Sequence, residues 1–103
     1  MSIKNYLFSY GSLQDEKIQL ALYTRTLIGS KDKLIGYRRA KEKIASRYPI
    51  IFETNKPKDS IVGMVFHVSD KELIETDTYE GDFYQRVKVI LESGLTAWCY
   101  VMQ

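Results

Sequence analysis

The apolar run at residues 61–68 is the sequence feature that most limits how this chain can fold. A continuous apolar run of this length is typical of a strand that is covered on both faces, so we expect it at the centre of a sheet. A turn rich in Lys, Pro and Asp precedes it at residues 55–59. Ser69 follows it, and Glu72 stands at the spacing of a helix capping box. The sequence therefore predicts a central strand that leads directly into a short helix ending near Tyr79.

Shorter segments on both sides of this unit complete the expected fold. Asp15 is placed to cap a helix whose apolar positions between 18 and 22 suit one helical face, and Arg25 at its far end suits the helix dipole. Pro49 is expected at a strand start or a sheet edge. The charged stretch after residue 38 is not assigned. Further strands are expected at residues 6–10, 34–38, 48–52, 84–91 and 95–101, the last two joined by a tight hairpin turn at 92–94.

This pattern predicts an α+β fold, built as a small mixed sheet or barrel that is strongly curved and carries two short helices. A chain of 103 residues leaves room for a single domain, covering residues 1–103. At this size roughly 60–68% of the unfolded surface is buried on folding, which is enough for one modest core.

Cysteine and histidine usage excludes two ways of stabilising the chain. Cys99 is the single cysteine and His67 the single histidine, so neither an internal disulfide nor a structural zinc site can form. The sequence shows no signal-like core and no run approaching the ~20 apolar residues of a membrane span. We therefore expect a cytoplasmic protein without membrane contact.

Basic residues gather in one stretch of a chain whose net charge is only +2. A solvated strand-and-loop face explains this stretch, and a phosphate-binding patch is the alternative. Nucleic-acid binding through the same stretch, with tyrosines stacking on bases, is a further alternative that the small net charge disfavours. The residues concerned are Lys31, Lys33, Arg38, Arg39, Lys41, Lys43 and Arg47.

Several common catalytic motifs are missing from the sequence. The segment around Ser9 and Ser12 is not G-x-S-x-G, and neither glycine-rich nucleotide-binding motif occurs. His67 stands inside an expected strand, where a lone histidine is more often packed or solvated than catalytic. Cys99 also stands in an apolar strand and is expected to be an inert core residue.

Two segments that contain glycine remain as candidate sites. In the first, Gly11 follows a strand and precedes a helix, so the segment is either a tight turn or a loop whose N–H groups converge on an anion. In the second, Glu80 stands among aromatic residues just before a strand. It is either a solvated residue at a helix end or a functional carboxylate.

Taken together, these segments resemble the gamma-glutamylcyclotransferase-like family, which includes gamma-glutamylamine cyclotransferases. The resemblance extends over nearly the whole chain and rests on the order and spacing of its parts. Thr76 departs from it, because family members usually carry leucine there, and many members continue beyond the position of Gln103. The matching parts are Tyr10-Gly11-Ser12-Leu13, Tyr48-Pro49-Ile50, the strand at 62–66, Asp77, Tyr79-Glu80-Gly81, Tyr84, Arg86 and Tyr100-Val101.

The resemblance implies a small barrel-like fold with one cavity and a reaction that needs no cofactor. The substrate is a gamma-glutamyl amine or peptide, whose alpha-amino group attacks its own side-chain carbonyl and releases 5-oxoproline and a free amine. Glu80 matches the family's catalytic acid/base. The loop of Tyr10, Gly11, Ser12 and Leu13 is expected to grip the glutamyl head, with Ser12 as a polar anchor and not a nucleophile. Tyr84 and Arg86 match a supporting pair on the substrate side. A small-ligand-binding protein of the same fold, without turnover, is the alternative.

Overall fold

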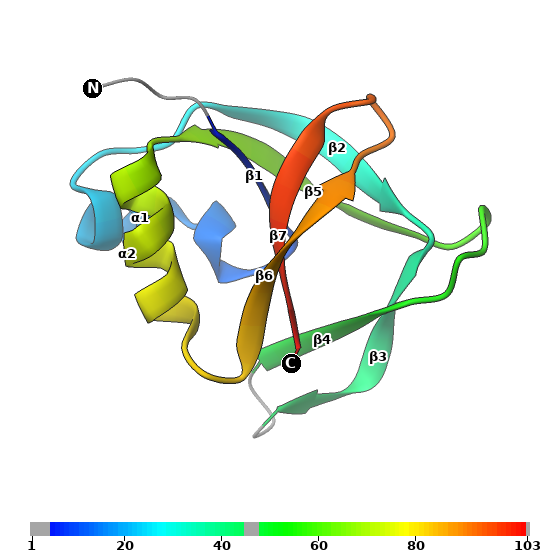
Figure 1. Cartoon of the computed structure of the whole chain (residues 1–103). Coiled ribbons are helices and arrows are strands. Elements are labelled where there is room, and N and C mark those ends of the chain that lie inside the picture. The colour runs from blue at the N-terminus through cyan, green and yellow to red at the C-terminus, as the bar shows by residue number, and fades with distance from the viewer. Residues whose placement is uncertain (1–4, 45–47, 103) are drawn as a thin grey trace.

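The computed structural model describes residues 5–44 and 48–102, with side chains for 5–40 and 50–102 (Figure 1). A five-stranded sheet with the order β2-β5-β1-β7-β6 forms its body, and β3 and β4 form a separate two-stranded sheet. The helices pack beside the larger sheet (Figure 1). The elements are β1 (Asn5–Ser9), the one-turn helix η1 (Ser12–Gln14), α1 (Glu16–Tyr23), β2 (Gly29–Ile35), β3 (Tyr37–Ile44), β4 (Tyr48–Glu53), β5 (Ser60–Val68), α2 (Asp70–Glu80), β6 (Tyr84–Ile90) and β7 (Thr96–Met102).

The larger sheet confirms the α+β prediction. Its strands pair antiparallel except for β1 and β7, which run parallel, so the sheet is mixed as expected. The apolar run at 61–68 falls in β5, which pairs with β1 on one side and β2 on the other. Gly63 lies where this strand crosses the end of β1, and a side chain there would meet the Ser9 carbonyl oxygen at 2.4 Å. The close approach of two backbones explains the glycine inside an otherwise apolar strand.

The sequence left two possibilities, a curved sheet or a barrel, and the structure has the sheet, which does not close into a barrel. The edge strands β2 and β6 form no ladder with each other. The tip of the β6–β7 hairpin reaches β2 instead, where the Glu92 N–H donates to the Lys33 carbonyl over 2.9 Å. Ser93 Oγ adds a hydrogen bond to Asp32 Oδ2 at 2.5 Å. A clasp between a loop and an edge strand thus replaces the last ladder of a barrel.

The prediction of a single strand at 34–38 is wrong, because the chain turns sharply at Gly36 between β2 and β3. This residue has a φ of +85°, which side chains disfavour, and its N–H and carbonyl bond Asp59 and Thr54. The turn sends β3 away from the larger sheet to pair with β4. The stretch that the sequence left unassigned is therefore β3, and Pro49 stands near the start of β4 as expected.

Both expected helices form with the expected caps. The Asp15 side chain accepts a hydrogen bond from the Lys17 N–H at the start of α1. Ser69 and Glu72 make the reciprocal capping box at the start of α2. The expectation that Arg25 interacts with the helix dipole at the end of α1 is wrong, because the residue lies beyond the last turn of the helix. Its guanidinium group pairs with Glu72 at 2.8 Å and so connects the chain after α1 to α2.

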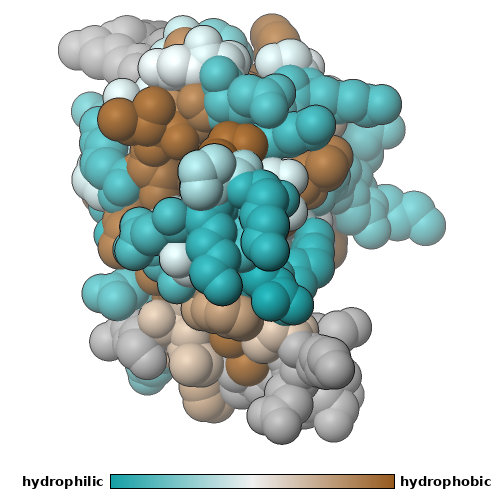
Figure 2. Space-filling model, turned by 90° about the vertical axis from the view of Figure 1, so that its right-hand side faces the viewer, coloured by the Kyte–Doolittle hydropathy of each residue, from teal (hydrophilic) through white to brown (hydrophobic). Residues whose placement is uncertain are grey.

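The buried side chains form two clusters on opposite faces of β1. Phe8 belongs to a cluster with the inner residues of β2, β5 and β7, whereas Leu7 belongs to one that α1 and α2 cover. On the face in Figure 2, hydrophobic side chains stand in groups separated by hydrophilic ones. Within the described residues, no helix is long and apolar enough to cross a membrane.

Candidate active site

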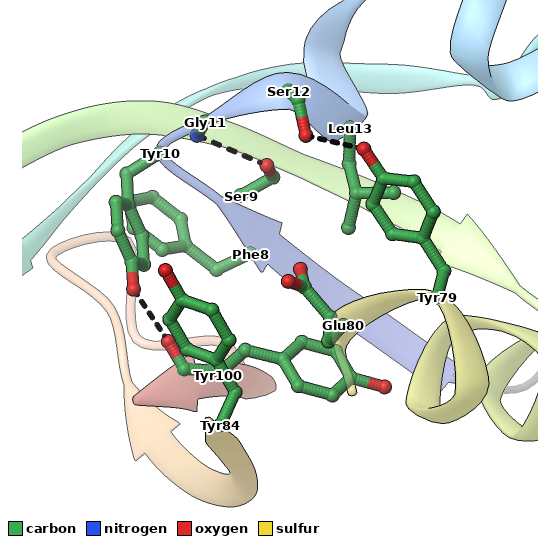
Figure 3. Close-up of a pocket in the computed structure, with 10 residues that line it drawn as sticks. All are labelled: Phe8, Ser9, Tyr10, Gly11, Ser12, Leu13, Tyr79, Glu80, Tyr84 and Tyr100. Carbon is green, nitrogen blue, oxygen red and sulfur yellow. Dashed lines mark hydrogen bonds between the residues drawn. The ribbon is translucent and has the colours of Figure 1, made fainter. Parts of the chain in front are cut away.

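A cavity of about 150 Å³ opens where the end of β1, the last turn of α2 and the strands β6 and β7 meet (Figure 3). Both segments that the sequence singled out contribute to it, although they lie about 70 residues apart in the chain. The residues that line it are Phe8, Ser9, Tyr10, Gly11, Ser12, Leu13, Tyr79, Glu80, Tyr84 and Tyr100.

Glu80 is the carboxylate of this cavity. It is the last residue of α2, because Gly81 follows with a φ of +77° and ends the helix. Figure 3 shows its carboxylate directed from the helix end into the space facing β1 and the following loop. Burial raises the pKa of Glu80 to about 7. A carboxyl group with this pKa both accepts and returns a proton near neutral pH.

The loop of residues 10–13 forms the opposite wall. Gly11 has a φ of −142° and a ψ of −141°, so it does not adopt the left-handed conformation that favours glycine. The loop owes its shape instead to η1, whose single turn starts at Ser12. Within the described part of the chain, the backbone N–H groups of Ser12 and Leu13 have no hydrogen-bond partner. Both residues line the cavity, so their N–H groups are candidate donors to a bound acceptor group.

The Ser12 hydroxyl group faces an aromatic residue of α2. Its hydroxyl group lies 2.7 Å from the Tyr79 hydroxyl oxygen, so the two groups share a hydrogen bond across the cavity (Figure 3). His67, the single histidine, packs edge-on against the Tyr6 ring at 4.8 Å and does not line the cavity. The described residues therefore offer Ser12 no histidine partner, in agreement with a polar anchor.

Tyrosines form much of the remaining wall. The Tyr10 hydroxyl group donates to the Tyr100 carbonyl over 2.6 Å, and Tyr84 stands beside them from the start of β6 (Figure 3). Burial raises the pKa of both Tyr10 and Tyr100 far above the ordinary value. These hydroxyl groups therefore stay neutral and act as hydrogen-bond donors.

Arg86 does not line the cavity. Its Nε lies 3.0 Å from Asp77 Oδ1, and its guanidinium group stacks over the Trp98 ring at 4.4 Å. Asp77 Oδ1 also accepts a hydrogen bond from the Tyr100 hydroxyl over 2.5 Å. Asp77 thus connects Arg86 to Tyr100 of the cavity wall, which is also the residue opposite Arg86 in the β6–β7 ladder.

Sequence reasoning did not name every residue of the cavity. Phe8 and Ser9 line it, but their strand positions give no local signal that separates them from core residues. Tyr79 and Tyr100 also line it, and they belonged to the resemblance without being assigned a site role. Cys99 is fully buried, as expected, and burial raises the pKa of its thiol to about 12. The side chains of Lys41, Lys43 and Arg47 lie outside the described residues, so the expected basic patch is described only in part.

A family model described as "Gamma-glutamyl cyclotransferase, AIG2-like" matches residues 7–103, which span both walls of the cavity. The chain belongs to this gamma-glutamyl cyclotransferase family. No curated protein matches it.

Solved structures of similar fold agree with this membership. Two Arabidopsis thaliana proteins, At3g28950.1 and At5g39720.1, are 27% and 28% identical, with TM-scores of 0.82 and 0.79. The matches cover 99% and 95% of this chain, and 66% and 68% of those proteins. A structure titled "Gamma-glutamyl cyclotransferase" is 23% identical with a TM-score of 0.70 and matches 96% of this chain and 66% of its own. At that identity the likeness shows a shared fold. The chain spans about two thirds of the length of these proteins.

Proposed function

We propose that this protein is a gamma-glutamyl cyclotransferase that converts a gamma-glutamyl amine or peptide into 5-oxoproline and a free amine. The observation that carries the proposal is the raised pKa of Glu80 in a cavity that is also lined by Ser12 and Leu13, whose N–H groups have no partner among the described residues. A cavity of about 150 Å³ is also of the size known to hold a six-membered ring, so the five-membered ring of the product fits.

The proposed reaction begins with the substrate's alpha-amino group. An amine of pKa about 8 is mostly protonated at neutral pH, so a base must remove a proton before it attacks. The ionised Glu80 carboxylate takes that proton. The nitrogen then bonds to the gamma-carbonyl carbon, the bond from this carbon to the leaving nitrogen breaks, and Glu80 returns the proton to the departing amine. The attacking nitrogen still holds one proton more than the amide nitrogen of 5-oxoproline keeps, and Glu80 passes this second proton to the released amine, which departs as an ammonium ion. No atom is left over and no cofactor enters.

The loop of residues 10–13 is proposed to hold the substrate folded for ring closure. The N–H groups of Ser12 and Leu13 donate to the substrate's alpha-carboxylate or to the oxyanion that develops on the gamma-carbonyl. Enforced ring-closing geometry supplies about 7–11 kcal/mol in well-oriented intramolecular reactions, which exceeds the contribution of the base. The cavity is thus proposed to act mainly by shape, with Glu80 moving the proton.

The test is 5-oxoproline release from a panel of gamma-glutamyl amines, gamma-glutamyl amino acids and glutathione. Replacing Glu80 with Gln should lower kcat by about 10²–10⁴-fold while the substrate still binds. The wild-type kcat/KM should rise with pH through a midpoint near 7, because Glu80 must be ionised to accept the proton.

The control is Glu75→Gln, which removes a carboxylate from the same helix at a position that does not line the cavity. This variant should keep wild-type turnover. If the wild-type protein binds members of the panel but releases no 5-oxoproline, the protein is a binder of small ligands and the proposed activity is refuted.

A further inference from the structure

All four carbonyl oxygens of the substrate loop are occupied by donors from elsewhere in the chain. The N–H groups of Ser12 and Leu13 have no partner in the described residues. The loop is therefore held in place through its carbonyl oxygens, and these two N–H groups remain available to a ligand. Two of the donors are backbone N–H groups of the turn, and two are side chains. The pairs are Tyr10 O with Arg39 Nη2 at 2.7 Å, Gly11 O with Gln14 N at 3.1 Å, Ser12 O with Asp15 N at 3.0 Å, and Leu13 O with Gln19 Nε2 at 2.8 Å.

Gln19 is the buried member of this set. Its side chain on α1 is only 2% exposed, although glutamine is normally a surface residue. Nε2 donates to the Leu13 carbonyl over 2.8 Å, and Oε1 accepts from the Leu27 N–H over 2.8 Å. Because one partner is an acceptor and the other a donor, the amide group fits in one orientation only. The residue therefore fixes the loop relative to the segment that follows α1.

We propose that Gln19 is the positioning residue of the substrate loop: it holds the Leu13 carbonyl away from the cavity and so keeps the loop's N–H groups available to the substrate's carboxylate or oxyanion. The inference rests on the proposed function of this cavity. Without the Gln19 donor, the Leu13 carbonyl is a buried acceptor with no partner. It regains one by rotating toward solvent, and Leu13 itself lines the cavity. A carbonyl dipole turned toward an anionic group repels it.

A second buried hydrogen bond on the same helix provides a matched control. The Tyr23 hydroxyl group shares a hydrogen bond with Thr76 Oγ1 at 2.5 Å and ties α1 to α2 without touching the loop. Thr76 Oγ1 still donates to the Glu72 carbonyl when the Tyr23 hydroxyl is removed. Tyr23→Phe therefore removes one buried hydrogen bond from α1, whereas Gln19→Met removes the bond from α1 to the loop at Leu13, together with the bond to Leu27.

The experiment compares the two variants on the gamma-glutamyl substrate with the highest wild-type turnover. Gln19→Met should lower kcat/KM by about 10- to 100-fold, mostly through a higher KM, because the loop grips the substrate before the ring closes. Tyr23→Phe should change kcat/KM by less than about 3-fold at a similar melting temperature. The pH midpoint of kcat/KM should stay at the wild-type value in both, because Glu80 is untouched. Equal losses in the two variants would overturn the inference.

Backbone amide NMR keeps the inference testable where turnover is absent. The amides of Ser12 and Leu13 should show rigid-backbone relaxation in the wild type and in Tyr23→Phe, and increased motion in Gln19→Met. Gln19→Leu is the second variant if Gln19→Met fails to fold, because its apolar side chain has no donor for the Leu13 carbonyl. Unchanged Ser12 and Leu13 amide signals in the folded Gln19 variants would overturn the inference. Absence of 5-oxoproline from the wild type refutes only the proposed activity.

Discussion

The partly buried carboxyl group of Glu80 leads to a prediction about stability that needs no substrate. Burial raises its pKa from the ordinary 4.5 to about 7. Each pH unit of such a difference corresponds to about 1.4 kcal/mol, so ionising Glu80 in the folded chain costs about 3 kcal/mol more than in the unfolded chain. The folded state thus holds a proton that the unfolded state releases between pH 4.5 and 7. The associated stability is present below pH 4.5 and is lost as the pH rises through 7.

Glu80→Gln removes this penalty because the amide stays neutral at every pH. The variant and the wild type should have similar free energies of unfolding at pH 4.5. At pH 8 the variant should be more stable by up to about 3 kcal/mol, even though it has lost its catalytic carboxylate. Urea denaturation at several pH values measures the free energy of unfolding of the variant and of the wild type. The difference between the two free energies removes the contribution of all groups that titrate alike in both proteins.

The control for losing a carboxylate from α2 is Glu75→Gln, measured in the same series. A stability difference between Glu80→Gln and the wild type that is the same at pH 4.5 and pH 8 would refute the reasoning. It would mean that Glu80 is not buried in solution as it is in the structure, and the proposed acid/base role would lose its physical basis.

Two further predictions concern the cavity wall and the strand behind it. Ser12→Ala removes the hydrogen bond to Tyr79 at the edge of the cavity, so 5-oxoproline formation should fall by no more than about 10-fold; loss of all turnover would show that Ser12 is a nucleophile. Gly63→Ala places a methyl group 2.4 Å from the Ser9 carbonyl oxygen and 2.7 Å from the Phe8 ring, so the free energy of unfolding should fall by at least about 1–3 kcal/mol. An unchanged melting temperature would contradict that close packing.

Local signals predicted the helices and most strands well. The caps at Asp15 and Ser69 depend on residues that are neighbours in the sequence, so their hydrogen bonds can be predicted from spacing alone. The strand split at Gly36 was missed, because glycine inside an apolar run can mark either a bend or a close approach of two backbones. Gly63 is the second case and Gly36 the first, and the two differ only in their distant neighbours.

The candidate site was predicted where its residues form a motif and missed where only the fold brings them together. Glu80 and the loop of residues 10–13 line one cavity, and the resemblance paired them. Gln19 was missed, because a polar residue on a helix is ordinarily read as solvent-facing, and Leu20 beside it was expected on the buried face but is 51% exposed. Arg86 was expected at the substrate, but it contacts Asp77.

The clasp between the hairpin tip and β2 has a consequence for how such chains can vary. It joins the two edges of the open sheet at the end of the β6–β7 ribbon away from Tyr84, and so away from the cavity. A few loop contacts, centred on Asp32 and Ser93, determine how far the hairpin tip lies from β2. Related chains can therefore widen, tighten or rebuild that end by changing a handful of surface residues, while the pocket at the other end keeps its dimensions.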